Sequence, residues 1–174
     1  YEPGLGYYSG AGRKFGPDGD FVTAPEISPL FSRCVAAQVA EVLDRSGGAV
    51  LEFGAGSGVL AADLLGELES RAVLPEEYLI LEVSAELRHR QRQTLEARVP
   101  GLIERVRWLD HLPGQPLSGV VVANEVLDAF PVSRFRLQGG GVEMLAVSCD
   151  GDALNASWVP AHADLHEAVA RVLK

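Results

Sequence analysis

The chain has 174 residues, of which 47% are hydrophobic, and a formal net charge of −9. This composition predicts a folded domain with a sizeable core, and the acidic charge disfavours nucleic acid as a partner, because nucleic-acid-binding proteins gather lysine and arginine on one face. Neither the two cysteines, Cys34 and Cys149, nor the four histidines have the spacing of metal ligands or of a disulfide framework. No apolar run approaches the roughly 20 residues of a membrane-spanning helix. We expect a bacterial cytoplasmic protein without a metal site or membrane insertion; a mitochondrial location would need a transit peptide in a missing N-terminal segment.

Residues 1–27 are rich in glycine and contain three prolines without a sustained apolar period, which predicts a loop-rich N-terminal arm. Ser28 and Pro29 then begin a predicted helix, whose apolar residues recur every three or four positions until Gly47 and Gly48. We therefore divide the chain into a glycine-rich arm over residues 1–27 and one domain over residues 28–174.

Four short apolar segments alternate with amphipathic helices in the next part of the chain. The predicted strands span residues 49–53, 78–83, 106–109 and 119–123, and the predicted helices span residues 58–68 and 84–99. Nearly all-apolar strands that alternate with helices indicate a parallel sheet with helices on both faces. The expected fold is α/β, with a Rossmann-like sheet in three layers, α/β/α.

The pattern changes after Pro131. Residues 132–137 and 142–147 flank three glycines and predict an antiparallel β-hairpin, and a last helix begins near Asp164. Because the chain ends inside this predicted helix, we expect the sheet to be incomplete at the C-terminus.

Residues 52–58 (E-F-G-A-G-S-G) connect the first predicted strand to a helix. The alternating Gly54, Gly56 and Gly58, with Ala55 between the first two, let the backbone turn sharply and approach a ligand closely. The third glycine stands one position earlier than in the dinucleotide motif G-x-G-x-x-G, so the spacing disfavours NAD. Glu52 would repel a pyrophosphate but can bind an ammonium group, which favours S-adenosylmethionine. A plain tight turn is the alternative.

Two further acids follow predicted strands. Glu82 stands at the carboxyl end of the second strand, where a ligand laid across a parallel sheet would present its ribose, and its carboxylate can accept both hydroxyl protons. Asp110 follows the third strand and could accept a hydrogen bond from an adenine amino group. The alternatives are a solvated acid for Glu82 and an ordinary turn residue for Asp110.

Polar residues abruptly follow the fourth predicted strand, where open α/β sheets place their reacting groups. Asn124, Glu125 and Asp128 are the candidate catalytic residues. S-adenosylmethionine donates a methyl group, and the group that accepts it could be the guanidinium of an arginine. A guanidinium stays protonated near neutral pH, and acids such as Glu125 and Asp128 could hold its charge and draw off a proton. Alternatively, Asn124 and Asp128 cap the next helix and Glu125 is solvated.

Four motifs, in order along the chain, resemble the MidA-like class I methyltransferases, a family that includes the mitochondrial complex I assembly factor. The first motif is the N-terminal signature around residues 6–9 and 19–28, and the second is the loop of residues 52–60. The third combines Glu82, Val83 and Ser84 with the helix residues up to Leu95, and the fourth covers residues 124–135.

The resemblance implies a class I methyltransferase fold with S-adenosylmethionine as cofactor and an arginine-containing protein as substrate, with a subunit of respiratory complex I as one example. It also implies that Val83 contacts the cofactor and that Asp20, Thr23, Pro25 and Glu26 fold over it. The family is about twice this length. The alternative is a non-catalytic cofactor-binding or assembly module, and the sequence leaves the acceptor protein and the oligomeric state open.

Overall fold

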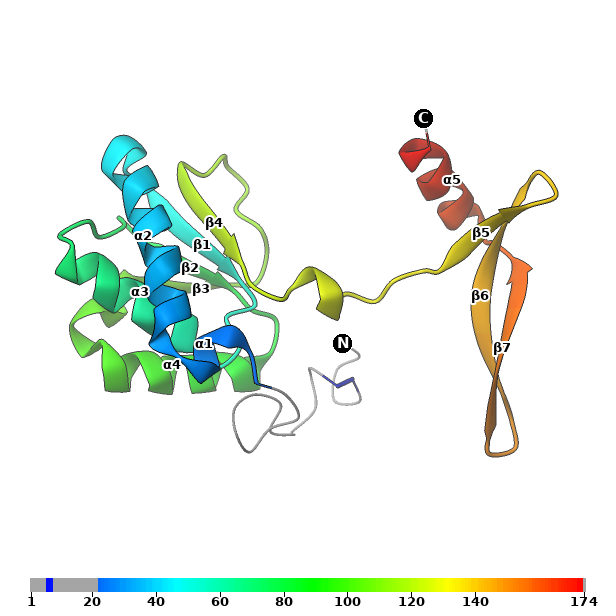
Figure 1. The fold of residues 1–174 in the computed structure, drawn as a ribbon, viewed down its shortest axis with the longest axis horizontal. Helices are drawn as coiled ribbons and strands as arrows, with labels where there is room; N and C mark the ends of the chain where they lie inside the picture. The colour runs from blue at the N-terminus through cyan, green and yellow to red at the C-terminus, as the bar shows by residue number, and fades with distance from the viewer. Residues whose placement is uncertain (1–5, 8–21, 174) are drawn as a thin grey trace. The chain divides into compact units, whose positions relative to one another are not determined.

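The computed structural model describes residues 6–7 and 22–173 and divides the chain into two compact units, Tyr1–Asp128 and Ala129–Lys174. Figure 1 draws the elements of both units along the chain. The boundary between them falls inside the range 28–174, which the sequence analysis treats as one domain. Most of the arm over residues 1–27 lies outside the described residues, as does Asp20.

The first unit contains a four-stranded parallel sheet with the strand order β3-β2-β1-β4. This arrangement confirms the predicted Rossmann-like α/β fold. The second strand ends two residues earlier than predicted, because Glu82 turns its carboxylate back onto the amide of Ser84. The strands are β1 (Ala49–Phe53), β2 (Tyr78–Leu81), β3 (Val106–Leu109) and β4 (Gly119–Ala123).

The three long helices of this unit begin and end within two residues of their predicted bounds, whereas the two short 3₁₀ helices were not predicted. Ser28 and Ser84 each accept a hydrogen bond from a first-turn amide, and these caps fix where two of the helices begin. One helical turn lies in the range predicted as a loop-rich arm. It was not predicted, because four residues are too few to show a helical period. The helices are α1 (Ala24–Ile27), α2 (Pro29–Ser46), α3 (Val59–Ser70), α4 (Ala85–Arg98), η1 (Pro100–Arg105) and η2 (Leu127–Ala129).

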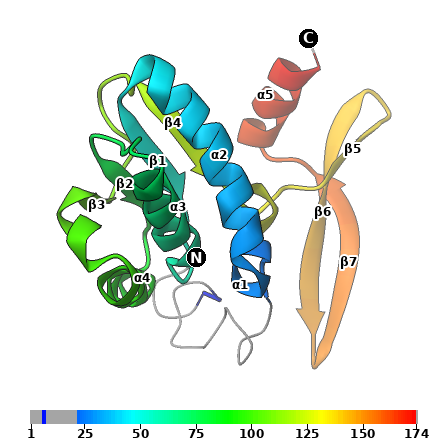
Figure 2. The same ribbon diagram turned by 60° about the vertical axis from the view of Figure 1, so that its left-hand side comes forward.

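The helices of this unit and one face of the sheet enclose the core. Val50, Tyr78 and Val122 contribute to this core from the strands, together with buried residues of α2, α3 and α4. Figure 2 shows α2 and α3 beside the sheet. The opposite face carries Leu51 and Leu79, and the described helices add no residue to that cluster. On this face Val121 is 57% exposed. Within the described part of the unit, two of the three predicted layers are therefore formed.

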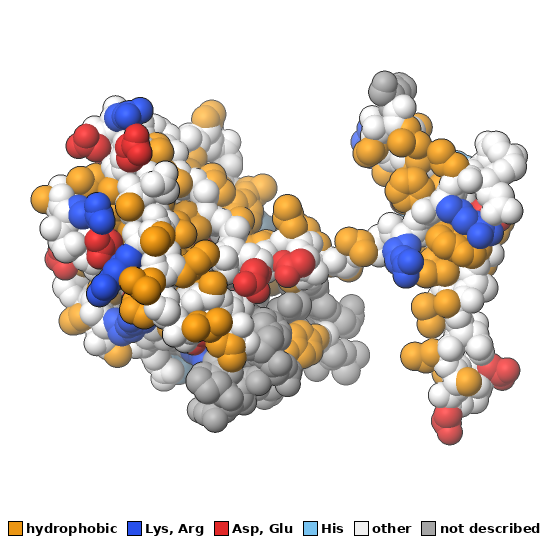
Figure 3. All heavy atoms as spheres, viewed as in Figure 1, with side chains coloured by type: hydrophobic (Ala, Val, Ile, Leu, Met, Phe, Trp, Pro, Cys, Tyr) orange, Lys and Arg blue, Asp and Glu red, His pale blue; other side chains and the backbone are white. Residues whose placement is uncertain are grey.

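The second unit is a three-stranded antiparallel sheet followed by a helix. Its first two strands confirm the predicted hairpin, which turns at Gly139 and Gly140 with positive φ at both residues, as a two-residue hairpin turn requires. The third strand was not predicted. Hydrophobic side chains are exposed along this sheet (Figure 3). The elements are β5 (Phe135–Gln138), β6 (Gly141–Asp150), β7 (Ala153–Pro160) and α5 (Ala163–Val172).

The described residues contain no helix that is long and apolar enough to cross a membrane. Within the same residues, no group of three or more His, Cys, Asp or Glu side chains could hold a metal ion.

Candidate functional site

The glycine loop between β1 and α3 depends on left-handed backbone conformations. Gly54, Gly56 and Gly58 have φ values of +59°, +53° and +82°. Residues with a Cβ rarely adopt such positive φ angles. Gly58 also lacks room for a side chain, because an added Cβ would lie 2.9 Å from the Cα of Gln91. The amide of Gly54 donates to Leu81 O at 3.0 Å, which ties the start of the loop to the end of β2.

Glu52, the last-but-one residue of β1, is a buried acid beneath this loop. Its side chain lies among the core residues and is 2% exposed. The hydroxyl of Tyr78 donates to Glu52 Oε2 over 2.6 Å. Burial raises the pKa of Glu52 from 4.5 to about 7; the Tyr78 hydrogen bond works against this rise, and the nearby charge of Glu82 adds to it. Glu52 therefore titrates near neutral pH.

Glu82 follows the end of the neighbouring strand β2 and is 6% exposed. Its carboxylate is fixed on both sides, because Oε1 accepts from the Ser84 amide at 2.9 Å and Oε2 from Gln91 Nε2 at 3.1 Å. Each oxygen keeps a further lone pair. Val83, the next residue, is exposed. Because β1 and β2 are parallel neighbours, both acids lie at the same edge of the sheet.

Asp110 is joined to this region through Arg88. The guanidinium donates through Nε to the backbone oxygen of Glu82 at 2.6 Å and through Nη2 to Leu109 O at 2.7 Å. The same Nη2 lies 2.8 Å from Asp110 Oδ1. Asp110 is exposed, so its second oxygen faces solvent. A role of Asp110 toward adenine stays a prediction.

The N-terminal helix α1 contacts the glycine loop. Ser57 Oγ, in the middle of the loop, donates a hydrogen bond to Glu26 Oε1. The amide of Glu26 donates to Thr23 O at 2.9 Å, which closes the first turn of α1, and Pro25 is buried. Glu26 is therefore brought against the glycine loop, while its place over the cofactor stays a prediction.

The segment after β4 also approaches the glycine loop. An added Cβ at Gly54 would lie 3.8 Å from Val126 Cγ2. Glu125 has a φ of +52°, an unusual conformation for a residue with a side chain. Asp128 lies inside η2 and is exposed, as Glu125 is. These residues stand at the same edge of the sheet as the two acids.

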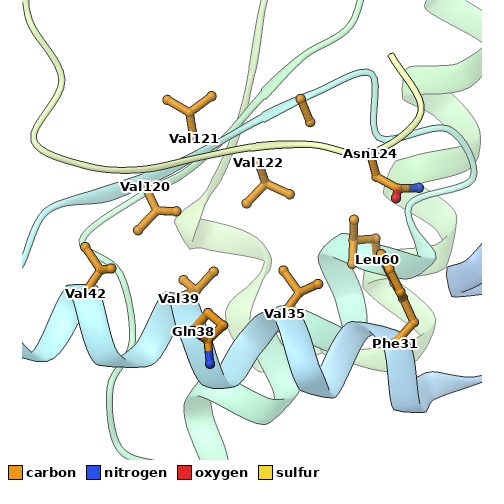
Figure 4. Close-up of a pocket in the computed structure, with 11 residues that line it drawn as sticks. Phe31, Val35, Gln38, Val39, Val42, Leu60, Val120, Val121, Val122 and Asn124 are labelled. Carbon is orange, nitrogen blue, oxygen red and sulfur yellow. The ribbon is translucent and has the colours of Figure 1, made fainter. Parts of the chain in front are cut away.

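Asn124 lines an apolar pocket of about 320 Å³ between α2 and β4 (Figure 4). Phe31 and Val35 of α2 face Val120 and Val122 of β4 across this pocket. Neither Glu52 nor Glu82 contributes to its lining. Residues 52–58 are also absent from its lining, so Asn124 is the candidate site residue that this pocket reaches.

Three further residues were given no role from the sequence: Tyr78, Gln91 and Trp108, whose Nε1 donates to Gln91 Oε1. Gln91 was named only as one of the helix residues of the third family motif. Tyr78 was assigned only to an apolar strand, although a buried tyrosine needs a hydrogen-bond partner for its hydroxyl. Gln91 occupies a core position of α4, four residues after Leu87 and four before Leu95, all three buried. A glutamine at an apolar helix position is the signal that could have identified it.

The acids and the accessible loop backbone are compatible with the charge of S-adenosylmethionine. Gly54 is exposed and carries no side chain, so a ligand can reach the loop backbone there. Glu52 and Glu82 are the two buried acids beside the loop, and their roles toward an ammonium group and two ribose hydroxyls stay predictions.

Comparison with known proteins agrees with this fit. A solved structure from Burkholderia thailandensis, of a COG1565 superfamily member bound to S-adenosyl-homocysteine, is 50% identical with a TM-score of 0.85 and matches 98% of this chain and 46% of its own. Curated relatives are the "Protein arginine methyltransferase NDUFAF7 homolog, mitochondrial" of Drosophila melanogaster, 31% identical over 79% of this chain, and its Mus musculus counterpart, 29% identical over 87%.

This chain spans 36% and 40% of the lengths of those two curated relatives. The model of a family described as "Putative S-adenosyl-L-methionine-dependent methyltransferase" matches residues 34–174. With a match over most of its length, and with the glycine loop and both acids inside the matched range, the chain belongs to this family of S-adenosyl-L-methionine-dependent methyltransferases.

Proposed function

We propose that this chain forms the cofactor-binding part of an enzyme that transfers a methyl group from S-adenosylmethionine to an arginine nitrogen of a protein. The observation that carries the proposal is the pair of buried acids, Glu52 and Glu82, at the ends of adjacent strands beside the glycine loop. The arginine acceptor is supported by the names of the Drosophila melanogaster and Mus musculus relatives.

In this proposal each acid binds one part of the cofactor. Glu52, ionised, binds the ammonium group through Oε1, since Tyr78 already occupies Oε2. Glu82 accepts from the two ribose hydroxyls through the lone pairs that Ser84 and Gln91 leave free. The remaining contacts come from the loop, from the ends of β2 and β3, and from α1: Gly54, Ala55, Gly56, Gly58, Val83, Asp110, Thr23, Pro25 and Glu26.

The acceptor side is formed by the segment after β4. Bound S-adenosylmethionine supplies an electrophilic methyl group on a sulfonium centre, and the protein must align a nitrogen lone pair with it. Glu125 and Asp128 carry exposed carboxylates that can hold a guanidinium and accept its proton, and Asn124 can orient it through its amide. The chemistry then needs no covalent intermediate.

Calorimetric titration with S-adenosyl-homocysteine tests the cofactor part. We expect the wild-type chain to bind, Glu52→Ala to lose most of the affinity, and Glu69→Ala, an exposed acid on α3, to bind like the wild type. A wild-type chain that does not bind contradicts the proposal.

Transfer of a labelled methyl group from S-adenosylmethionine to arginine-containing proteins tests the acceptor part, with Glu125→Gln as the variant expected to lose activity. Label on lysine alone contradicts the arginine assignment. Binding without any transfer favours the non-catalytic module instead.

A further inference from the structure

Gln91 connects three separate parts of the first unit. Its side chain is fully buried, with 0% exposure, on the face of α4 that packs against the sheet. Nε2 donates to Gly56 O and to Glu82 Oε2, both at 3.1 Å, and Oε1 accepts from Trp108 Nε1 at 2.9 Å. One side chain thus joins the glycine loop, the acid after β2, and β3.

The orientation of the Gln91 amide follows from its partners. The indole N–H of Trp108 can only donate, so it must face the oxygen of the amide. A backbone carbonyl and an ionised carboxylate can only accept, so both must face the nitrogen. Each of the two amide protons of Gln91 then has one acceptor, Gly56 O or Glu82 Oε2. A flipped amide would break all three hydrogen bonds, so the chemistry of the partners selects one rotamer.

The helix holds the glycine loop at two further points. Thr94, one turn after Gln91, donates from Oγ1 to Ser57 O at 2.7 Å. Gly58 packs directly on the backbone of Gln91, which leaves no space for a Cβ. The carbonyl groups of Gly56 and Ser57 both point to α4. Because the N–H of a trans peptide points opposite to its carbonyl, the amide of Ser57 faces away from the helix.

We propose that Gln91 is a positioning residue, which sets the separation between the glycine loop and Glu82 and thereby matches it to the two halves of the cofactor. The inference rests on the proposed function, since it assumes that Glu82 binds the ribose. Gln91 has no direct role toward the ligand, because its side chain is fully buried and both amide protons are used by Gly56 and Glu82. Its effect on affinity must therefore pass through these partners.

A double-mutant cycle measures this effect. The variants are Gln91→Leu, Glu82→Gln and the double variant, and the readout is the dissociation constant of S-adenosyl-homocysteine by calorimetry. We expect Gln91→Leu to weaken binding by about tenfold, and the double variant to bind no more weakly than Glu82→Gln alone, because both changes disturb the same ribose contact. Gln93→Leu is the matched control, an exposed glutamine on the same helix whose side chain hydrogen-bonds to His89; it should bind like the wild type.

A purely structural role would give a different result. In that case Gln91→Leu would lower the melting temperature without the expected pattern of affinities. The proposal is overturned if Gln91→Leu leaves the affinity unchanged, or if its loss of affinity multiplies with that of Glu82→Gln. If Gln91→Leu does not fold, as judged by circular dichroism, Trp108→Phe decides. It keeps an aromatic ring but removes the N–H that orients the amide, and unchanged affinity in this variant overturns the proposal. A wild-type chain that does not bind S-adenosyl-homocysteine refutes the proposed function itself. The cycle distinguishes this failure from a failure of the Gln91 proposal, because the latter is judged only on variants of a chain that binds.

Discussion

Replacing Glu52 with glutamine should stabilise the fold while it removes the acid proposed to bind the cofactor. Burial raises the pKa of Glu52 from 4.5 to about 7. Between these two pH values the folded chain holds a proton that the unfolded chain has released. The free energy of unfolding therefore falls as pH rises through this range, and above pH 7 the full cost of a buried ionised carboxylate is present.

The size of this cost follows from the two pKa values. At 1.36 kcal/mol for each pKa unit, the difference between 4.5 and about 7 corresponds to about 3 kcal/mol at pH 8 and to almost nothing at pH 4.5. Glutamine has nearly the same volume, cannot ionise, and can still accept from the Tyr78 hydroxyl. We expect Glu52→Gln to raise the free energy of unfolding by about 2–3 kcal/mol at pH 8.

Urea unfolding followed by circular dichroism at pH 4.5, 6 and 8 measures this effect in the absence of ligand. The gain should grow with pH while the slope against urea stays constant. Glu69→Gln, an exposed acid on α3, should change stability equally at all three pH values. A Glu52→Gln variant that is less stable than the wild type at pH 8 would refute the reasoning, because the ionised carboxylate would then be stabilised by its surroundings.

Three further predictions follow from the same geometry. The affinity for S-adenosyl-homocysteine should fall about tenfold for each pH unit below 7, because Glu52 must ionise to bind an ammonium group; calorimetry in which Glu52→Gln shows the same slope would contradict this. Gly58→Ala should lower the free energy of unfolding by about 2–4 kcal/mol through strain at positive φ and overlap with Gln91, whereas Gly101→Ala, with nothing within 4 Å of an added Cβ, should not; equal melting temperatures for the two would disprove the packing argument. Ser84→Ala should cost about 1 kcal/mol by removing the cap of α4, and Ser84→Asp should restore it in thermal unfolding; a loss that aspartate does not restore would point away from capping.

Periodicity located the elements of the first unit because its strands are buried and its helices have one apolar face. Residues 49–53, 106–109 and 119–123 have the predicted bounds, since glycine or polar residues flank each mostly apolar segment. β7 was not predicted, although apolar and polar residues alternate from Leu154 to Trp158. That alternation is typical of a strand with one covered face, and it was the available signal.

Site residues could be predicted from the sequence where an acidic residue stands at the carboxyl end of a predicted strand. Glu52 and Glu82 each follow this rule, and the structure places both beside the glycine loop. Gln91 does not follow it, since two of its three partners, Gly56 and Trp108, stand 35 residues before it and 17 residues after it in the chain. Such contacts depend on how α4 packs on the sheet, and no local pattern encodes that packing. The same holds for the hydrogen bond between Ser57 and Glu26.

Strand β4 is the outer strand of the described parallel sheet. Among the described residues it pairs only with β1, so one row of its amide and carbonyl groups has no partner strand within the described part of the chain. Backbone groups of this kind are satisfied when a further strand pairs with them. The described part of the sheet can therefore be extended on the β4 side, and such a strand would lie beside Val120 to Val122.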